Sequence, residues 1–107
     1  MTLQHVVLFS FPRELSDDEA AQMRAMVASW PAGIGLMSSC RFGTDLTQAR
    51  TRGYGYLLYT EFPDADALSR YRAHPLHLQF LAWITERDCT PLAFDYYLDE
   101  RTVLMAE

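Results

Sequence analysis

The 107-residue chain is half hydrophobic and carries a formal net charge of −5. This length and hydrophobic content are enough for one core, so we predict one domain over residues 1–107. The acidic balance and the scattered arginines disfavour a nucleic-acid partner, because binding to phosphates requires clustered basic side chains. All nine basic residues are arginine, so no side chain can form the Schiff base that lysine-dependent catalysis requires.

The sequence has no apolar run near the roughly 18 residues that a membrane helix needs, and its first residues lack the basic and apolar regions of a secretory signal. We therefore expect a cytoplasmic protein with no membrane partner. Cys40 and Cys89 are isolated, without the spacing of a zinc site or the density of a disulfide scaffold, so we expect free thiols.

The first predicted strand covers residues 3–11 and is apolar on both faces. His5, Val7 and Phe9 share one face, whereas Val6 and Leu8 share the other. A strand of this kind needs a cover on both sides. We expect helices on one side and a second copy of the chain on the other.

A helix begins after Ser16, because Ser16 and Glu19 form a capping-box pattern and the acidic residues between them suit a helix N-terminus. Its core-facing stripe includes Met23, Val27 and Trp30, and a following proline and glycine end the helix. Met23 and Val27 fit two interpretations, which are ordinary core packing and the lining of a pocket.

The rest of the chain alternates strands and helices separated by turn residues. We predict strands over 36–42 and 53–62, helices over 65–72 and 75–87, and a final strand over 89–98. Leu58 lies in the middle of the third strand. Pro91 indicates that the last strand is an edge strand or that the strand starts at this residue. Residues 47–52 are polar without an apolar period and predict a surface loop.

This order predicts an α+β fold, the ferredoxin-like βαββαβ arrangement of a four-stranded antiparallel sheet with helices on one face. We expect the other face to carry His5, Val7, Phe9 and Leu58. Such an apolar face is rarely left exposed in a soluble monomer. We therefore predict a homodimer in which two sheets pack face to face as a dimeric α/β barrel, with one pocket per chain between sheet and helices.

The densest group of proton-transfer side chains lies in residues 71–80. Pro75 suits the first turn of a helix, and counting from it places His77 on one helix face with Phe80, Leu81 and Ile84. Tyr71 follows Leu68 by three residues and closes the apolar face of the preceding helix. Tyr71 and His77 are thus predicted to face inward together, with His74 as the residue that starts the second helix.

These two side chains are candidates for acid–base catalysis. A histidine among apolar neighbours is disfavoured as a cation and can take an acidic proton next to a carbonyl, so His77 is the candidate base. A tyrosine stays protonated and can donate to the enolate oxygen, so Tyr71 is the candidate donor, with His5 as a second polar group. The alternative for His77 is a structural hydrogen bond that ties the helices to the sheet.

We expect neither a metal nor another cofactor. His5, His74 and His77 do not show the spacing of convergent metal ligands, and the chain lacks a nucleotide-binding loop, a nucleophile elbow and a haem motif.

Several segments together resemble the stress-responsive dimeric α/β-barrel family, called Dabb. They are Gln4 to Phe9, Gly43 to Leu46, Gly53-Tyr54, Phe62, Tyr71 to His77, and Phe94-Asp95-Tyr96. The resemblance extends over residues 3–96, and its most specific parts are the His-Pro-x-His motif and Phe-Asp-Tyr.

The resemblance implies roles for individual residues. In a cofactor-free polyketide cyclase of that family, the catalytic tyrosine and histidine match Tyr71 and His77, and a pocket histidine matches His5. Other pocket positions match Val7, Phe9 and Leu58. The first helix departs from the cyclase, because Met23, Arg24 and Val27 stand where the cyclase has aromatic pocket residues, and this changes the expected pocket shape.

The expected function is therefore a cofactor-free enzyme that acts on a carbonyl-activated, hydrophobic or aromatic-precursor substrate, with aldol-type polyketide cyclisation as the leading reaction. Two alternatives stay open. One is a stress-responsive or small-molecule-binding barrel without catalysis. The other is a cofactor-independent monooxygenase or decarboxylase, for which dependence on dioxygen would distinguish the monooxygenase.

Overall fold

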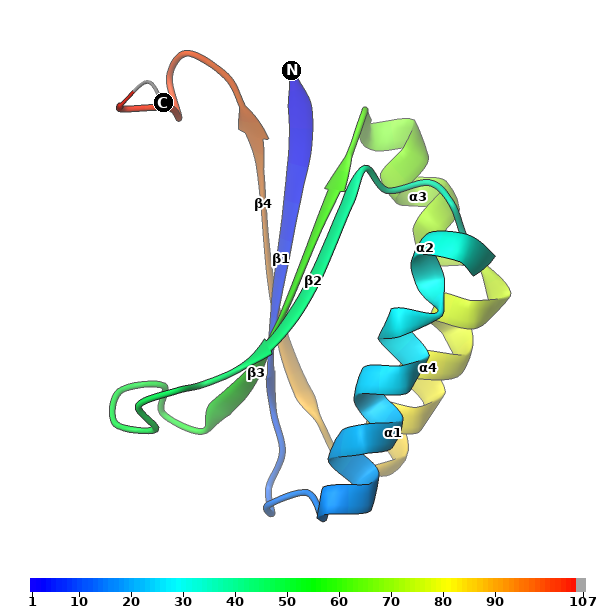
Figure 1. Cartoon of the computed structure of the whole chain (residues 1–107), viewed down its shortest axis with the longest axis vertical. Coiled ribbons are helices and arrows are strands. Elements are labelled where there is room, and N and C mark those ends of the chain that lie inside the picture. The colour runs from blue at the N-terminus through cyan, green and yellow to red at the C-terminus, as the bar shows by residue number, and fades with distance from the viewer. Residues whose placement is uncertain (106–107) are drawn as a thin grey trace.

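The computed structural model describes residues 1–105 and arranges them as one sheet with helices on one side (Figure 1). Residues 106 and 107, which the predicted domain includes, lie outside the described part. The elements are β1 (Thr2–Ser10), α1 (Asp17–Ala28), α2 (Trp30–Gly33), β2 (Ser39–Thr44), β3 (Tyr54–Phe62), α3 (Ala65–Ala73), α4 (Pro75–Glu86) and β4 (Thr90–Leu98). None of these helices has the length and apolar character needed to cross a membrane.

The sheet is antiparallel in the order β2-β3-β1-β4, which confirms the ferredoxin-like prediction. β1 and β3 are the central strands, and they receive most of the cover from the helices. β2 and β4 are the edges, so the expectation that Pro91 lies in an edge strand or at its start is confirmed. β2 begins three residues later than the prediction of 36–42.

The prediction about which sheet face the helices cover was wrong. His5, Val7, Phe9 and Leu58 are buried beneath the helices, with exposed fractions of 8% or less. The alternation of a strand shows which residues share a face, but it does not show on which face the helices pack.

The opposite side of the sheet is the uncovered one, and we call it the open face. It is formed by alternate residues of the four strands, and its apolar members are Val6, Leu8, Leu57, Tyr59, Leu92, Phe94 and Tyr96. Leu57, Leu92 and Phe94 are 37%, 51% and 67% exposed. The expected apolar face therefore exists, but other residues form it.

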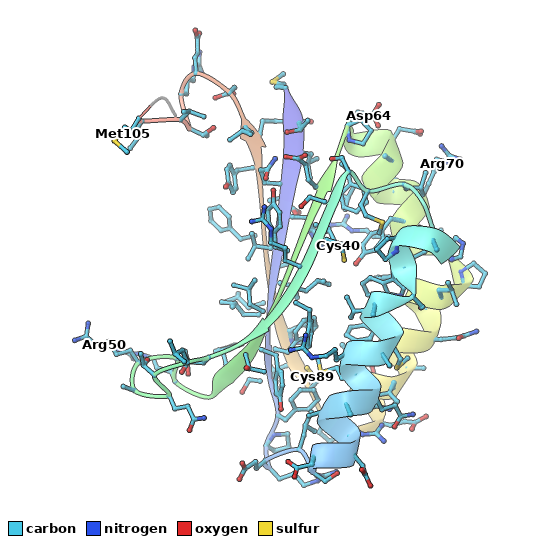
Figure 2. All side chains as sticks on the ribbon, viewed as in Figure 1. Cys40, Arg50, Asp64, Arg70, Cys89 and Met105 are labelled. Atoms are coloured by element: carbon cyan, nitrogen blue, oxygen red, sulfur yellow. The ribbon has the colours of Figure 1, made fainter. Side chains whose placement is uncertain are left out.

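Between the sheet and the helices lies the core, which contains the aromatic side chains Phe9, Trp30, Phe62, Tyr71 and Phe80. Cys40 and Cys89 border this layer as half-buried free thiols (Figure 2), as expected. Burial raises the pKa of both thiols, so they remain protonated near neutral pH.

Local hydrogen bonds cap the start of α1. The Ser16 hydroxyl accepts from the Glu19 amide while the Glu19 carboxylate accepts from the Ser16 amide, so the predicted capping box is confirmed. Glu19 also bonds Arg13 and Arg87, and the Arg87 guanidinium lies over the ring of Trp83. This network joins the start of α1 to the end of α4.

The buried stripe of α4 differs by one position from the prediction. Phe80, Trp83 and Ile84 are buried, whereas Leu81 is 37% exposed. Trp83 takes the position because that side of α4 faces the segment between β1 and α1, where Phe11 packs edge-on against it.

Replacing Ser16 with alanine should lower the free energy of unfolding by about 1 kcal/mol, because the Glu19 amide then loses its capping oxygen. Thermal unfolding monitored by circular dichroism measures the change. Ser29→Ala is the control, since the Ser29 hydroxyl donates only to the Met26 carbonyl at the other end of α1. Equal destabilisation by the two variants would contradict a specific role for the cap.

Candidate active site

Tyr71 and His77 meet across a sharp corner between α3 and α4. His74 has the extended backbone conformation that a residue before proline prefers, and Pro75 occupies the first turn of α4. The His74 Nδ1 atom accepts from the Leu76 amide at 3.1 Å, which confirms that His74 starts the helix. The corner places the rings of Tyr71 and His77 4.4 Å apart, centroid to centroid.

His77 is half-buried and carries its proton on a defined nitrogen. Its Nδ1 atom lies 3.2 Å from the carbonyl oxygen of Arg72. Because a carbonyl can only accept, Nδ1 must donate, and in the neutral ring Nε2 keeps its lone pair. Burial lowers the pKa of His77 below its ordinary value of 6.5. At neutral pH the ring is therefore an uncharged base with a free Nε2 atom.

Tyr71 is fully buried at the end of α3. Its hydroxyl group has no hydrogen-bond partner among residues 1–105, and burial raises the pKa of this phenol above its usual value. The group therefore stays protonated across the neutral range and has a free proton to donate.

His5 is the third member of the group. Its ring lies edge-on to Tyr71 at 6.1 Å, and its Nδ1 atom bonds a carboxylate oxygen of Asp95. Asp95 in turn contacts the Arg72 guanidinium at 3.4 Å. Since Nδ1 faces a carboxylate, it donates and the Nε2 atom of His5 is left as the acceptor in the neutral ring.

Sequence reasoning missed the role of Asp95, although it noted the Phe-Asp-Tyr motif. The only signal was that a carboxylate interrupts an aromatic strand. Its relation to His5 arises from the pairing of β1 with β4, where His5 and Asp95 are directly opposite each other. Two residues 90 positions apart cannot be placed together by a local pattern.

Trp30 was predicted as a core residue but not as a neighbour of this group. It is 1% exposed, and its ring contacts Tyr71, His77 and Phe80 at centroid distances of 5.5, 5.7 and 5.1 Å. Phe62 packs against Tyr71 on another side at 4.9 Å. The space predicted as a pocket beside His5, Tyr71 and His77 is thus bordered closely by aromatic side chains.

The other predicted site residues lie in the same layer but are not all close together. Val7 and Leu58 are directly opposite each other on adjacent strands. Phe9 lies about 13 Å along the strand from His5 and packs on Phe80 instead. Met23 and Val27 are buried on α1, which fits core packing.

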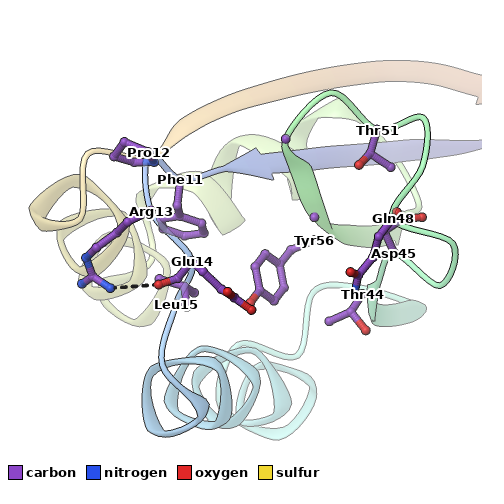
Figure 3. A pocket seen from close by; sticks show the side chains of 12 residues that line it. Phe11, Pro12, Arg13, Glu14, Leu15, Thr44, Asp45, Gln48, Thr51 and Tyr56 are labelled. Carbon is purple, nitrogen blue, oxygen red and sulfur yellow. Dashed lines mark hydrogen bonds between the residues drawn. The ribbon is translucent and has the colours of Figure 1, made fainter.

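The two surface pockets that the structure describes lie away from Tyr71 and His77, at the end of the sheet where β1 ends and β2 connects to β3. The larger, of about 600 Å³, is formed by the segment after β1 and by the β2–β3 connection. Figure 3 shows Glu14 and Asp45 around the ring of Tyr56 in this pocket. A second pocket of about 320 Å³ adjoins it. Neither is lined by His5, Tyr71 or His77.

No cluster of three or more histidine, cysteine, aspartate or glutamate side chains suited to a metal ion occurs within residues 1–105.

The profile of a family described as the stress responsive A/B barrel domain, Dabb, matches residues 3–98. No curated protein matches the chain.

Solved structures match closely in fold. A dimeric ferredoxin-like protein of unknown function from Thermobifida fusca has 26% identity and a TM-score of 0.79, and the match covers 92% of each chain. A dimeric protein of the same fold from Bacteroides fragilis has 21% identity and a TM-score of 0.78, with 91% of this chain and 96% of that one covered. The hydroxynitrile lyase from Passiflora edulis has 20% identity and a TM-score of 0.80, covering 92% and 94%.

Histidine titration by NMR should give His77 a midpoint below pH 6.5, with the hydrogen on Nδ1 in the neutral form. The lowered pKa means that the unfolded chain holds this proton more tightly than the folded one. His77 therefore contributes to stability above pH 6.5, and the contribution is lost as the pH falls through the folded-state pKa. His77→Gln assigns the resonance, and a midpoint above 6.5 would contradict the burial argument.

Proposed function

The chain belongs to the stress-responsive A/B barrel domain family, and on this basis together with the site geometry we propose that it is a cofactor-independent acid–base enzyme acting on a carbonyl-activated substrate. The observation that carries the proposal is the contact between the rings of Tyr71 and His77, 4.4 Å apart, in which a neutral base and an unpaired phenol donor lie side by side. Their complementary protonation states are those needed for abstraction of a proton next to a carbonyl.

In the proposed reaction, the Nε2 atom of His77 takes a proton from the carbon next to the substrate carbonyl. The electrons of the broken C–H bond move into the enolate, whose oxygen accepts a hydrogen bond from the Tyr71 hydroxyl. A preorganised donor of this type contributes about 3 kcal/mol to transition-state stabilisation. His5, held by Asp95, lies edge-on to the phenol ring as an additional polar group.

The finer proposal is an aldol-type cyclisation of a polyketide-like precursor. The enolate carbon attacks a second carbonyl of the same molecule, a C–C bond forms, and the new alkoxide takes the proton from the His77 imidazolium. No electrons are gained or lost overall, so the reaction needs only the base and the donor. The aromatic and aliphatic lining supports a hydrophobic or aromatic-precursor substrate, as do Val7 and Leu58 near the sheet centre.

A second candidate is a small-molecule-binding barrel without catalysis. The close aromatic packing of Trp30 and Phe62 around Tyr71 favours it, since a filled layer suits a structural role. The first candidate is preferred, because a packing role leaves the unpaired Tyr71 hydroxyl unexplained. One structure with this fold is named a hydroxynitrile lyase, so lyase chemistry is compatible with the fold.

We further propose that the chain forms a homodimer through the open face. Exposed apolar side chains on this face each contribute about 1.5–3 kcal/mol when fully buried, and a two-fold axis allows two like faces to cover each other. The proteins from Thermobifida fusca and Bacteroides fragilis, which share the fold, are described as dimeric.

Deuterium exchange into the central carbon of pentane-2,4-dione, corrected for the spontaneous rate, tests the catalytic proposal. His77→Gln and Tyr71→Phe should each lower the exchange rate by about 100-fold, because they remove the base and the donor. His74→Asn is the matched control, since it removes an imidazole but keeps a side chain that caps α4. If both site variants exchange at the wild-type rate, the non-catalytic candidate is favoured.

Phe94→Asp should convert the dimer to a folded monomer, because it places a charge on the open face, which the proposed sheet-to-sheet interface buries. Sedimentation velocity at micromolar concentration measures the change, and a hydrophobic dye should bind the newly exposed face. Leu78→Asp is the control, since Leu78 is 51% exposed on α4. Phe9→Asp is unsuitable, because Phe9 is buried in the core. A wild-type chain that sediments as a monomer would contradict the proposal.

A further inference from the structure

A row of polar side chains crosses the sheet beneath the helices. Strand register places Thr60 of β3 directly opposite both Cys40 of β2 and His5 of β1, and His5 opposite Asp95 of β4. Each strand thus contributes one polar group to a single line on the helix-covered face. Elsewhere this layer is mainly aliphatic and aromatic, so the row is a local interruption of the core.

Within this row, the hydroxyl group of Thr60 stands out. Thr60 is fully buried, and its hydroxyl oxygen has no hydrogen-bond partner among residues 1–105. His5, by contrast, bonds Asp95. An unpaired buried hydroxyl destabilises the folded chain, and valine has nearly the same shape without this penalty. Packing alone therefore does not account for a threonine at this position.

The Thr60 hydroxyl belongs to the same region as the Tyr71 phenol. His5 is opposite Thr60 on β1, and Phe62 follows Thr60 by two residues on β3, so both lie beside Thr60 on the same face of the sheet. The His5 ring lies 6.1 Å from the Tyr71 ring, and the Phe62 ring lies 4.9 Å from it. Tyr71 therefore lies above the stretch of sheet that carries Thr60. Two buried hydroxyl groups that have no partner among residues 1–105 therefore lie in the same part of the core.

We propose that Thr60 is a specificity-determining residue of the Tyr71–His77 site, whose hydroxyl bonds a second oxygen of a compact dioxygenated carbonyl substrate. The inference rests on the proposed function for the position of the reacting carbonyl at Tyr71. A threonine hydroxyl both donates and accepts, so it accommodates a second carbonyl or an enol. The substrate is compact, because Trp30 and Phe62 border the phenol closely.

The side chains of the proposed site differ in their exposure. His77 is half-buried, and the Asp95 side chain is 36% exposed, so the group reaches the surface where the end of α3 approaches β4. Thr60 and Tyr71 are both fully buried. In the proposed site, a bound substrate would therefore contact His77 nearer the surface and the two hydroxyl groups further inside.

The test compares two ligands with the same carbon skeleton, pentane-2,4-dione and pentan-2-one, by NMR titration of wild type, Thr60→Val and Thr60→Ser. Thr60→Val should weaken binding of the dione by about 3- to 10-fold, the effect of one hydrogen bond, and change binding of the mono-ketone by less than about 2-fold. Thr60→Ser should retain the wild-type preference. Equal binding of the dione by wild type and Thr60→Val, or no binding by wild type, overturns the inference.

Thermal unfolding separates a binding role from a structural one. Because Thr60→Val removes an unpaired buried hydroxyl, its Tm should be unchanged or higher by up to about 4–8 °C. A lower Tm would show that the hydroxyl stabilises the fold and would overturn the inference. The proposed function fails separately: if wild type binds the dione through Thr60 but gives no deuterium exchange beyond the spontaneous rate, the contact stands and the catalytic assignment does not.

Discussion

The corner between α3 and α4 determines the distance between the rings of Tyr71 and His77, and the candidate site depends on this distance. Pro75 has no amide hydrogen to satisfy and restricts His74 to an extended conformation, so α3 must end and α4 must begin in a new direction. The His74 side chain then caps α4 through the Leu76 amide. As a result, Tyr71 from the last turn of one helix and His77 from the first turn of the next bring their rings together.

Burial gives these side chains their chemical character. The same apolar surroundings disfavour the charged form of both groups, which lowers the pKa of His77 and raises the pKa of Tyr71. A neutral base and a neutral donor therefore coexist over a wide pH range. Among residues 1–105 the buried hydroxyl groups of Tyr71 and Thr60 have no hydrogen-bond partner, which lowers the stability of the folded chain. If the proposed site is correct, this cost is a compromise between stability and function.

The two faces of the sheet carry different sets of side chains. The face beneath the helices contains the aromatic layer and the row that includes His5 and Thr60. The open face carries Leu57, Leu92 and Phe94, which have no cover in the isolated chain. A partner on the open face leaves the helix-covered layer unchanged, so the proposed assembly and the proposed chemistry depend on different side chains and can be disturbed separately.

Local pattern in the sequence was sufficient for the order of elements, the capping box at Ser16 and the corner at Pro75, because each depends on residues within one or two helical turns. The inward direction of Tyr71 and His77 followed from the same helical spacing. Only the tertiary structure decided which face of β1 the helices cover, that Trp30 lies against the phenol, and that Thr60 and Asp95 flank His5. These relations depend on strand register and layer packing between residues far apart in the chain, for which a two-residue alternation carries no information.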